Sequence, residues 1–155
     1  MLIEQAYSVV LFGHRDFDSH NALEQRLYPI LRNLITTKKL VRIFIGRNGE
    51  FDRFAATIVK RLQKELGKEN TEFICVLPYP QKDIEYYENY YDSVIIPEIV
   101  EKTHPKQAIT KRNEWMIEQC DLFICYVQHQ GGAKNALEYA KKLGKDIINL
   151  EKEIE

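Results

Sequence analysis

Three glycine-bearing turns carry most of the candidate chemistry in this sequence, and each follows an apolar run of strand length. The turns are Gly13-His14-Arg15, Gly46-Arg47-Asn48-Gly49 and Gly131-Gly132-Ala133. Because glycine has no Cβ, such a turn can be tight and can bring the backbone close to a ligand. A helix that begins just after the turn directs its free N–H groups at whatever lies above the strand. Together the turns predict one pocket for a nucleotide, a phosphate or another anion.

Charged and amide side chains near these turns have both a functional and a structural interpretation. Arg112 can bind a phosphate through its planar guanidinium, with Asn113 beside it, or it can be a surface arginine in a salt bridge. Asp52 can accept hydrogen bonds from ribose hydroxyls, or it can be a carboxylate favoured by the dipole of a helix. Glu138 can act as a general acid toward a leaving nucleobase, or it can be a solvated carboxylate. The sequence leaves these alternatives open.

Histidine, aspartate and cysteine do not occur at metal-binding spacings. His14, Asp16, Asp18 and His20 are close in sequence, but turn formation explains the aspartates better than a metal does. Cys120 and Cys125 lack a CxxC spacing, and Cys75 also lies in an apolar context. We therefore expect reduced core cysteines, no metal site and no cofactor.

Length and charge narrow the class of protein. The chain has 155 residues with 22 basic and 23 acidic side chains, a net charge of -1. A general basic surface for nucleic acid is therefore missing, although a local basic patch is compatible with this composition, so the charge gives no support to a nucleic-acid partner. Neither a signal peptide nor an apolar run of about 18 residues is present, so we expect a cytoplasmic protein that does not enter a membrane. By size, residues 1–155 are expected to form a single domain.

Strand-like and helix-like segments alternate along the chain. The predicted strands are 7–12, 41–45, 71–77, 93–96, 122–127 and 146–150, and the predicted helices are 21–35, 51–66, 81–92, 108–121 and 132–143. Residues 97–106 are predicted to be a loop and residues 151–155 a frayed tail. This alternation is typical of an α/β fold with a mostly parallel sheet of five to six strands between two layers of helices. Ligands in such folds lie beyond the carboxyl ends of the strands, where all three turns would meet.

The motifs in this order resemble the SLOG superfamily over nearly the whole chain. The similar segments are Gly13-His14-Arg15, Gly46 to Asp52, Arg112 to Met116, Gly131-Gly132-Ala133 and Gly144 to Asn149. The spacing is most similar to a small bacterial branch of uncharacterised proteins. The superfamily includes the DNA-processing protein DprA and the Lonely Guy phosphoribohydrolases. The resemblance implies a Rossmann-like three-layer fold, a nucleotide or nucleotide-derived ligand, and a homodimer.

Two motifs of the phosphoribohydrolases match in part. Their Arg-Lys-x-x-Met is similar to Arg112 to Met116, with Asn113 replacing lysine. Their Pro-Gly-Gly-x-Gly-Thr-x-x-Glu is similar to Gln130 to Glu138, in which Lys134 and Asn135 replace the Gly-Thr pair. The resemblance implies catalytic roles for Arg112 and Glu138 if the protein is a hydrolase.

Three functions therefore stand as alternatives. The first is a nucleotide-binding module or sensor, in which the ligand contacts Gly13, His14, Arg15, Gly46, Gly49, Asp52, Arg112, Asn113, Gly131, Gly132 and Ala133. The second is a phosphoribohydrolase that cleaves the N-glycosidic bond of nucleoside 5′-monophosphates. The third is a DprA-like partner of nucleic acid.

Overall fold

Six apolar segments form one sheet in which every neighbouring pair of strands is parallel. The computed structural model describes residues 6–16, 20–47 and 49–153. The strands are β1 (Tyr7–Gly13), β2 (Val41–Ile45), β3 (Thr71–Val76), β4 (Ser93–Ile95), β5 (Leu122–Tyr126) and β6 (Asp146–Asn149). Their order across the sheet is β4-β3-β2-β1-β5-β6. The register pairs Val9 of β1 with Ile43 on one side and Leu122 on the other.

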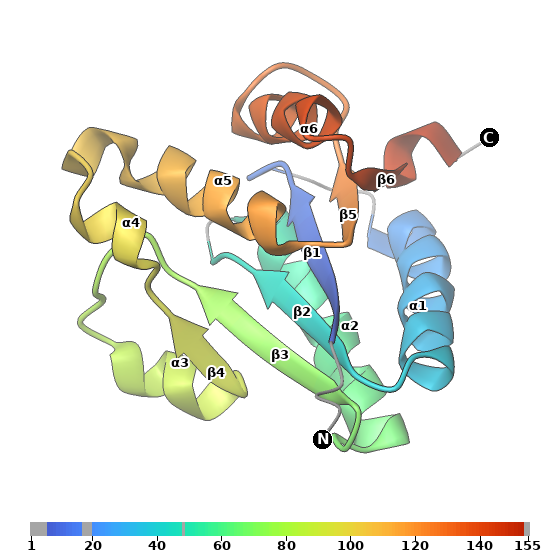
Figure 1. Ribbon diagram of the computed structural model, residues 1–155. Coiled ribbons are helices and arrows are strands. Elements are labelled where there is room, and N and C mark those ends of the chain that lie inside the picture. The colour runs from blue at the N-terminus through green and yellow to red at the C-terminus, as the bar shows by residue number, and fades with distance from the viewer. Residues whose placement is uncertain (1–5, 17–19, 48, 154–155) are drawn as a thin grey trace, which may run out of the picture.

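The connecting segments are mostly helical and cover both faces of the sheet (Figure 1). The helices are α1 (His20–Thr37), α2 (Glu50–Leu66), α3 (Ile84–Tyr90), α4 (Glu98–Glu101), α5 (Ala108–Gln119) and α6 (Gly132–Lys142). Short 3-10 turns occur at Pro105–Gln107 and Leu150–Glu153. This arrangement confirms the predicted α/β, Rossmann-like three-layer fold.

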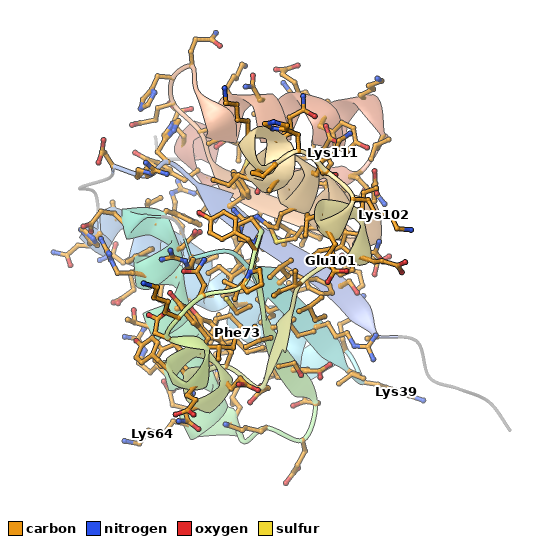
Figure 2. The ribbon with its side chains drawn as sticks, turned by 90° about the vertical axis from the view of Figure 1, so that its left-hand side faces the viewer. Lys39, Lys64, Phe73, Glu101, Lys102 and Lys111 are labelled. Atoms are coloured by element: carbon orange, nitrogen blue, oxygen red, sulfur yellow. The ribbon has the colours of Figure 1, made fainter. Side chains whose placement is uncertain are left out.

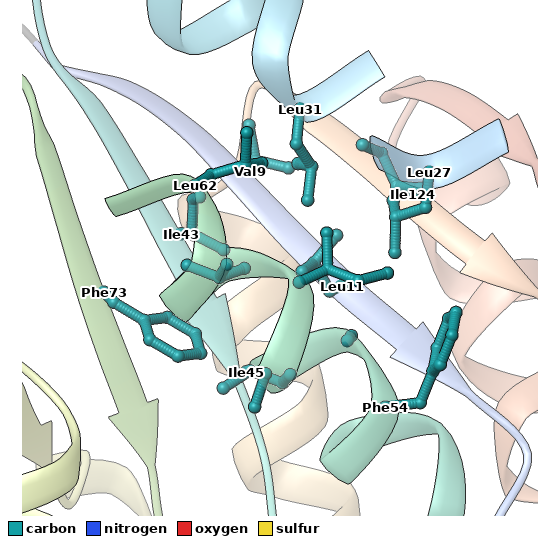
Figure 3. Packing of buried hydrophobic residues seen from close by; sticks show 14 of the residues in the cluster. Val9, Leu11, Leu27, Leu31, Ile43, Ile45, Phe54, Leu62, Phe73 and Ile124 are labelled. Carbon is teal, nitrogen blue, oxygen red and sulfur yellow. The ribbon is translucent and has the colours of Figure 1, made fainter. Parts of the chain in front are cut away.

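Each face of the sheet has its own apolar core, because side chains alternate along a strand. Val9, Ile43 and Ile124 point toward α1 and α2, where they pack with Leu27 and Leu62 (Figure 3). The opposite face packs against α5 and α6, and its cluster includes Val10, Phe123, Met116 and Leu137. A smaller cluster joins α3 to the edge of the sheet through Cys75, Leu77 and Tyr87. Because the central strands are covered on both faces, they are nearly continuous apolar runs.

The strand order places a topological switch between β1 and β5. From β1 the chain adds β2, β3 and β4 on one side and then returns to place β5 and β6 on the other. The loops that leave β1 and β5 therefore diverge, and an open crevice forms between them at the carboxyl edge. The loop after β1 begins at Gly13, and the loop after β5 extends to Gly131. Each loop therefore contains one of the predicted glycine turns.

Two local predictions differ from the structure. Residues 97–106, predicted as a loop, contain α4 and the start of a 3-10 turn, which are too short to show a helical period. The predicted frayed tail begins with residues of the second 3-10 turn, and residues 154–155 lie outside the described part. Pro29 lies inside α1, which is one continuous helix.

Among the described residues, no helix combines the length and hydropathy needed to cross a bilayer.

Candidate functional site

A pocket of about 300 Å³ lies at the switch between β1 and β5 and is called the main pocket below. The predicted ligand-binding residues that line it are Gly13, His14, Arg15, Gly46, Asp52, Arg112, Asn113, Gly131, Gly132 and Ala133. Phe12, Asp16, Ile109, His129 and Gln130 complete the wall. The fold therefore brings together turns that are more than 30 residues apart in sequence. Of the predicted ligand-binding residues, Gly49 alone lies outside this wall.

Arg112 projects from α5 into the interior at the base of the main pocket. Its side chain is almost fully buried, with 2% of the residue exposed. Nη1 donates a hydrogen bond to the carbonyl oxygen of Val76 at 2.8 Å, and Nε donates to Oδ1 of Asn113 at 2.8 Å. These bonds fix the plane of the guanidinium, and the Nδ2 group of Asn113, which lines the pocket, is not used in the bond to Arg112. Arg112 is therefore a positioned interior cation, which rules out the surface salt-bridge interpretation.

The charge on Arg112 is opposed by a carboxylate that lines the same pocket. Burial lowers the pKa of Arg112 from its ordinary value, and the Asp52 carboxylate opposes this effect more than any other group. Arginine nevertheless stays protonated in proteins because its ordinary pKa is so high. Asp52 lies in the first turn of α2 and lines the same pocket. The pocket therefore pairs one interior guanidinium with one half-buried carboxylate.

Two glycines of the main pocket make room for large neighbours. A Cβ at Gly46 would lie 2.9 Å from Nη1 and 3.2 Å from Cζ of Arg112. A Cβ at Gly13 would lie only 2.3 Å from the ring of Phe51, the residue that begins the buried stripe of α2. Gly132, in contrast, has nothing within 4 Å of its Cβ position and faces open space. Gly46 and Gly13 are thus needed for packing, whereas Gly132 leaves backbone accessible to a ligand.

The helices α2, α5 and α6 direct their N-termini toward this region. Gly49 caps α2 and Gly131 caps α6, and neither helix has a side-chain hydrogen bond at its cap among the described residues. Both glycines have positive φ angles, 147° and 138°, which other residues rarely adopt. Glycine caps leave N–H groups and partial positive charge at the helix start. The arrangement can therefore bind an anion through backbone donors as well as through Arg112.

His14 joins the loop after β1 to the loop after β5. Its Nε2 accepts hydrogen bonds from the backbone N–H groups of Gln128 at 2.8 Å and His129 at 3.3 Å. Its ring stacks on that of His129, with centroids 3.7 Å apart and planes inclined by 5°. Burial lowers the pKa of His14, and the neighbouring His129 lowers it further. His14 is consequently a neutral imidazole at pH 7, with its proton on Nδ1.

A second pocket of about 420 Å³ adjoins the first and is called the side pocket below. The two pockets share Arg15, Asp16 and Ile109 in their walls. The other residues of the side pocket are Arg47, Gly49, Glu50, Arg53 and Tyr79. Gly49 therefore belongs to this second pocket, where a Cβ would lie 2.6 Å from Cα of Arg15. The Glu50 N–H donates to the Arg15 carbonyl oxygen at 2.8 Å, which holds the two loops together.

Glu138 lies outside both pockets. It is on the exposed side of α6, where its side chain is 54% exposed and forms salt bridges with Lys134 at 3.1 Å and Lys141 at 3.6 Å. These lysines lower the pKa of the Glu138 carboxyl, with the hydrogen bond from Lys134 as the largest cause. The geometry thus favours the solvated helix-face interpretation of this residue.

The described residues provide neither a metal site nor a reactive thiol. They contain no group of three or more His, Cys, Asp or Glu side chains that could hold a metal ion. All three cysteines are free and buried, as predicted. Burial raises the pKa of Cys75 to about 12 and that of Cys120 to about 11, so neither forms a thiolate near neutral pH.

The basic side chains near the C-terminal end of α2 do not lie beside the main pocket. Lys60, Arg61, Lys64 and Lys68 lie along the C-terminal part of α2 and just beyond it, whereas the main pocket lies at its N-terminus. Figure 2 shows Lys64 and Lys39 well apart at the outside of the molecule. Lys68 also forms a salt bridge with Asp92, and Arg61 with Glu24.

Several residues of the two pockets are not among the predicted contacts. Ile109 belongs to α5, is 37% exposed and lines both pockets. Arg47 and Tyr79 each follow a strand closely, a position that could have indicated them. His129 gives no sequence signal, because its role depends on stacking with a residue 115 positions away.

Comparisons with known proteins identify the fold and no more. No protein-family model matches the chain, and no curated protein matches it significantly. The chain is similar to the X-ray structure of TM1055, a target of the Northeast Structural Genomics Consortium, with a TM-score of 0.59 and 14% sequence identity. The similarity covers 91% of this chain and 72% of that one. It therefore supports the Rossmann-like arrangement of the strands and helices.

Proposed function

We propose that this protein is a nucleotide-binding module of the SLOG type, whose ligand occupies the main pocket. The observation that carries the proposal is the buried guanidinium of Arg112 at the switch between β1 and β5. An interior cation is costly unless opposing charge lies close to it, and the Asp52 carboxylate is the opposing charge with the largest effect on the pKa of Arg112. A phosphate entering the pocket would add negative charge and hydrogen-bond acceptors beside this guanidinium.

Each part of a nucleotide has chemically suitable groups in this pocket. Arg15, Arg112 and the backbone at Gly131 and Gly132 suit a phosphate, because they offer guanidinium and helix N-terminal donors. Asp52 suits the ribose, because a carboxylate accepts hydrogen bonds from hydroxyls, and Nδ2 of Asn113 can donate to a ribose oxygen.

Binding is favoured over hydrolysis by the position of Glu138. A phosphoribohydrolase of the kind considered above needs that carboxylate within reach of the ribosyl centre or the leaving base. Glu138 instead pairs with two lysines on the exposed side of α6 and lines neither pocket. We therefore expect a bound nucleoside 5′-monophosphate to stay intact.

The test is a thermal-shift and calorimetric titration with AMP, ADP, ATP, ADP-ribose and NAD. A ligand at a hundred times its dissociation constant adds about 2.7 kcal/mol of stability, which raises Tm by several degrees. Arg112→Lys keeps the charge but loses the planar guanidinium, which can donate two parallel hydrogen bonds to a phosphate. We therefore expect binding to weaken about tenfold or more. Arg42→Lys is the matched control, because Arg42 is exposed, lies in β2 outside both pockets and pairs with Glu72 at 3.1 Å.

Two results would contradict the proposal. One is the absence of a shift with every nucleotide in the wild-type protein. The other is an equal shift in the wild-type protein and in Arg112→Lys. Incubation of the bound nucleotide followed by chromatography then separates binding from catalysis, since release of free base would establish the hydrolase instead.

A further inference from the structure

The side pocket has two arginines that do not line the main pocket, Arg47 and Arg53, in addition to Arg15, which lines both. Arg15, Arg47 and Arg53 line it together with two carboxylates, Asp16 and Glu50. Glu50 already pairs with Nη2 of Arg53 at 2.9 Å and lies 3.9 Å from Nε2 of His20. The Glu50 and Arg53 charges therefore largely cancel each other. Arg15 and Arg47 then face one remaining carboxylate, Asp16, so the pocket carries a surplus of positive charge.

Arg47 has hydrogen-bonding capacity that its described surroundings do not satisfy fully. Its Nε is buried and has no hydrogen-bond partner among the residues that the structure describes. Its guanidinium carbon lies 5.9 Å from the centroid of the Tyr87 ring, a cation–π contact. The charge of Arg47 also lowers the pKa of Arg112, so the two guanidinium groups repel each other. An anion bound beside Arg47 would reduce this repulsion.

The two pockets are continuous enough for one ligand to occupy both. Arg15, Asp16 and Ile109 belong to both walls, and Arg15 lies at the junction. All groups of a nucleoside monophosphate would be bound within the main pocket. A longer phosphate chain would pass Arg15 and continue toward Arg47.

We propose that the side pocket is a second anion subsite, which binds a further phosphoryl group of the nucleotide held in the main pocket. The ligand class is then nucleoside diphosphates and longer phosphate esters rather than monophosphates. This inference rests on the proposed function, because the first phosphate and the ribose stay in the main pocket. Arg47 would be a specificity-determining residue, because it would bind the second phosphoryl group.

The test compares AMP with ADP by titration calorimetry, with EDTA present so that no divalent cation shields the phosphates. In the wild-type protein we expect ADP to bind about tenfold tighter than AMP or better, because one charge-assisted hydrogen bond supplies such a factor. Arg47→Gln should lower the affinity for ADP to about that for AMP, with a much smaller effect on the affinity for AMP. Arg42→Gln, the control outside both pockets, should keep the wild-type ratio.

The outcomes separate this inference from the proposed function. If AMP binds and ADP binds no better in the wild-type protein, the second subsite is overturned and the main pocket stands. If Arg47→Gln weakens AMP and ADP by the same factor, the inference is also overturned, because Arg47 then acts on the whole site. If neither AMP nor ADP binds, the proposed function itself fails. The comparison in the wild-type protein needs no variant, so it decides the matter even if Arg47→Gln does not fold.

Discussion

At the scale of single residues, the site depends on an interior guanidinium and on a neighbour without a side chain. Arg112 can lie flat at the base of the main pocket because Gly46 leaves the space beside it open. A side chain at position 46 would force the guanidinium away from the Val76 carbonyl, to which it now donates at 2.8 Å. The pocket would then lose both its cation and a satisfied backbone acceptor.

Gly46→Ala should therefore lower both stability and ligand affinity. We expect a loss of about 1–3 kcal/mol in the free energy of unfolding, as is typical of overpacked interiors. Urea unfolding measures this loss. Gly132→Ala is the matched comparison, because nothing lies within 4 Å of its Cβ position, and it should leave stability nearly unchanged. Equal stabilities for the two variants would show that the guanidinium moves aside at no cost.

At the scale of elements, a single carboxylate links α2 to two strands at the edge of the sheet. Asp92 follows α3 and accepts hydrogen bonds from the Phe73 N–H at 2.8 Å, Nε2 of Gln63 at 2.7 Å and Nζ of Lys68 at 3.3 Å. Burial by itself raises the pKa of Asp92. The hydrogen bonds from Phe73, Gln63 and Lys68 outweigh burial and hold the pKa below the ordinary 3.8. The ionised form is thus the one that the fold stabilises.

Replacing this carboxylate should loosen the edge of the sheet. We expect Asp92→Ala to lose about 1.5–3 kcal/mol of unfolding free energy at pH 7, as for hydrogen bonds to a charged group. Because the folded pKa is depressed, this contribution is present above pH 3.8 and disappears as pH falls through the folded value. Asp83→Ala is the control, since Asp83 is exposed and makes no side-chain capping bond to α3. A loss as large in Asp83→Ala would contradict the assignment.

The elements were largely predictable from the sequence, but the contacts that build the site were not. The strands are recognisable because they are buried on both faces, and α2 because Phe54, Ile58 and Leu62 recur on one side. Helical spacing does not reveal that Ile109 is exposed and lines a pocket. Helical spacing also gives no reason to bury Arg112, whose partner Val76 is 36 residues away. Such positions are decided by which strands become neighbours, and that information is absent from local spacing.

The predicted pocket illustrates the same limit. The glycine turns indicated the correct edge of the sheet, because glycine after a strand is a local signal. The side pocket was missed, because Arg47 and Tyr79 belong to different loops and carry no shared motif. They become neighbours only when β2 and β3 pair in parallel, with Ile45 opposite Cys75.

At the scale of the whole molecule, His14 connects the two halves of the sheet across the switch between β1 and β5. Its Nε2 accepts from the Gln128 and His129 N–H groups only while the ring is neutral. Protonation would place an N–H opposite those donors and would charge a buried ring stacked on His129. The loop that carries Gly131 and Gly132 should therefore be held less firmly in acid.

Stability should fall as the pH drops below 6.5. Burial and His129 lower the folded pKa of His14, so the unfolded chain binds this proton first. The contribution of His14 is fully present above the unfolded pKa of 6.5 and is lost as pH falls through the folded value. The slope contributed by one proton is at most about 1.4 kcal/mol per pH unit. Urea unfolding between pH 7.5 and pH 5 measures it.

His14→Gln isolates this contribution from that of other titrating groups. Glutamine cannot be protonated, and its Oε1 can accept from the same loop, so the variant should show a flatter dependence of stability on pH. His104→Gln is the control, because His104 is exposed and its Nδ1 accepts only from the nearby Lys106 N–H among the described contacts. It should keep the wild-type slope. If His14→Gln also kept that slope, the neutral imidazole would have no part in joining the two halves of the sheet.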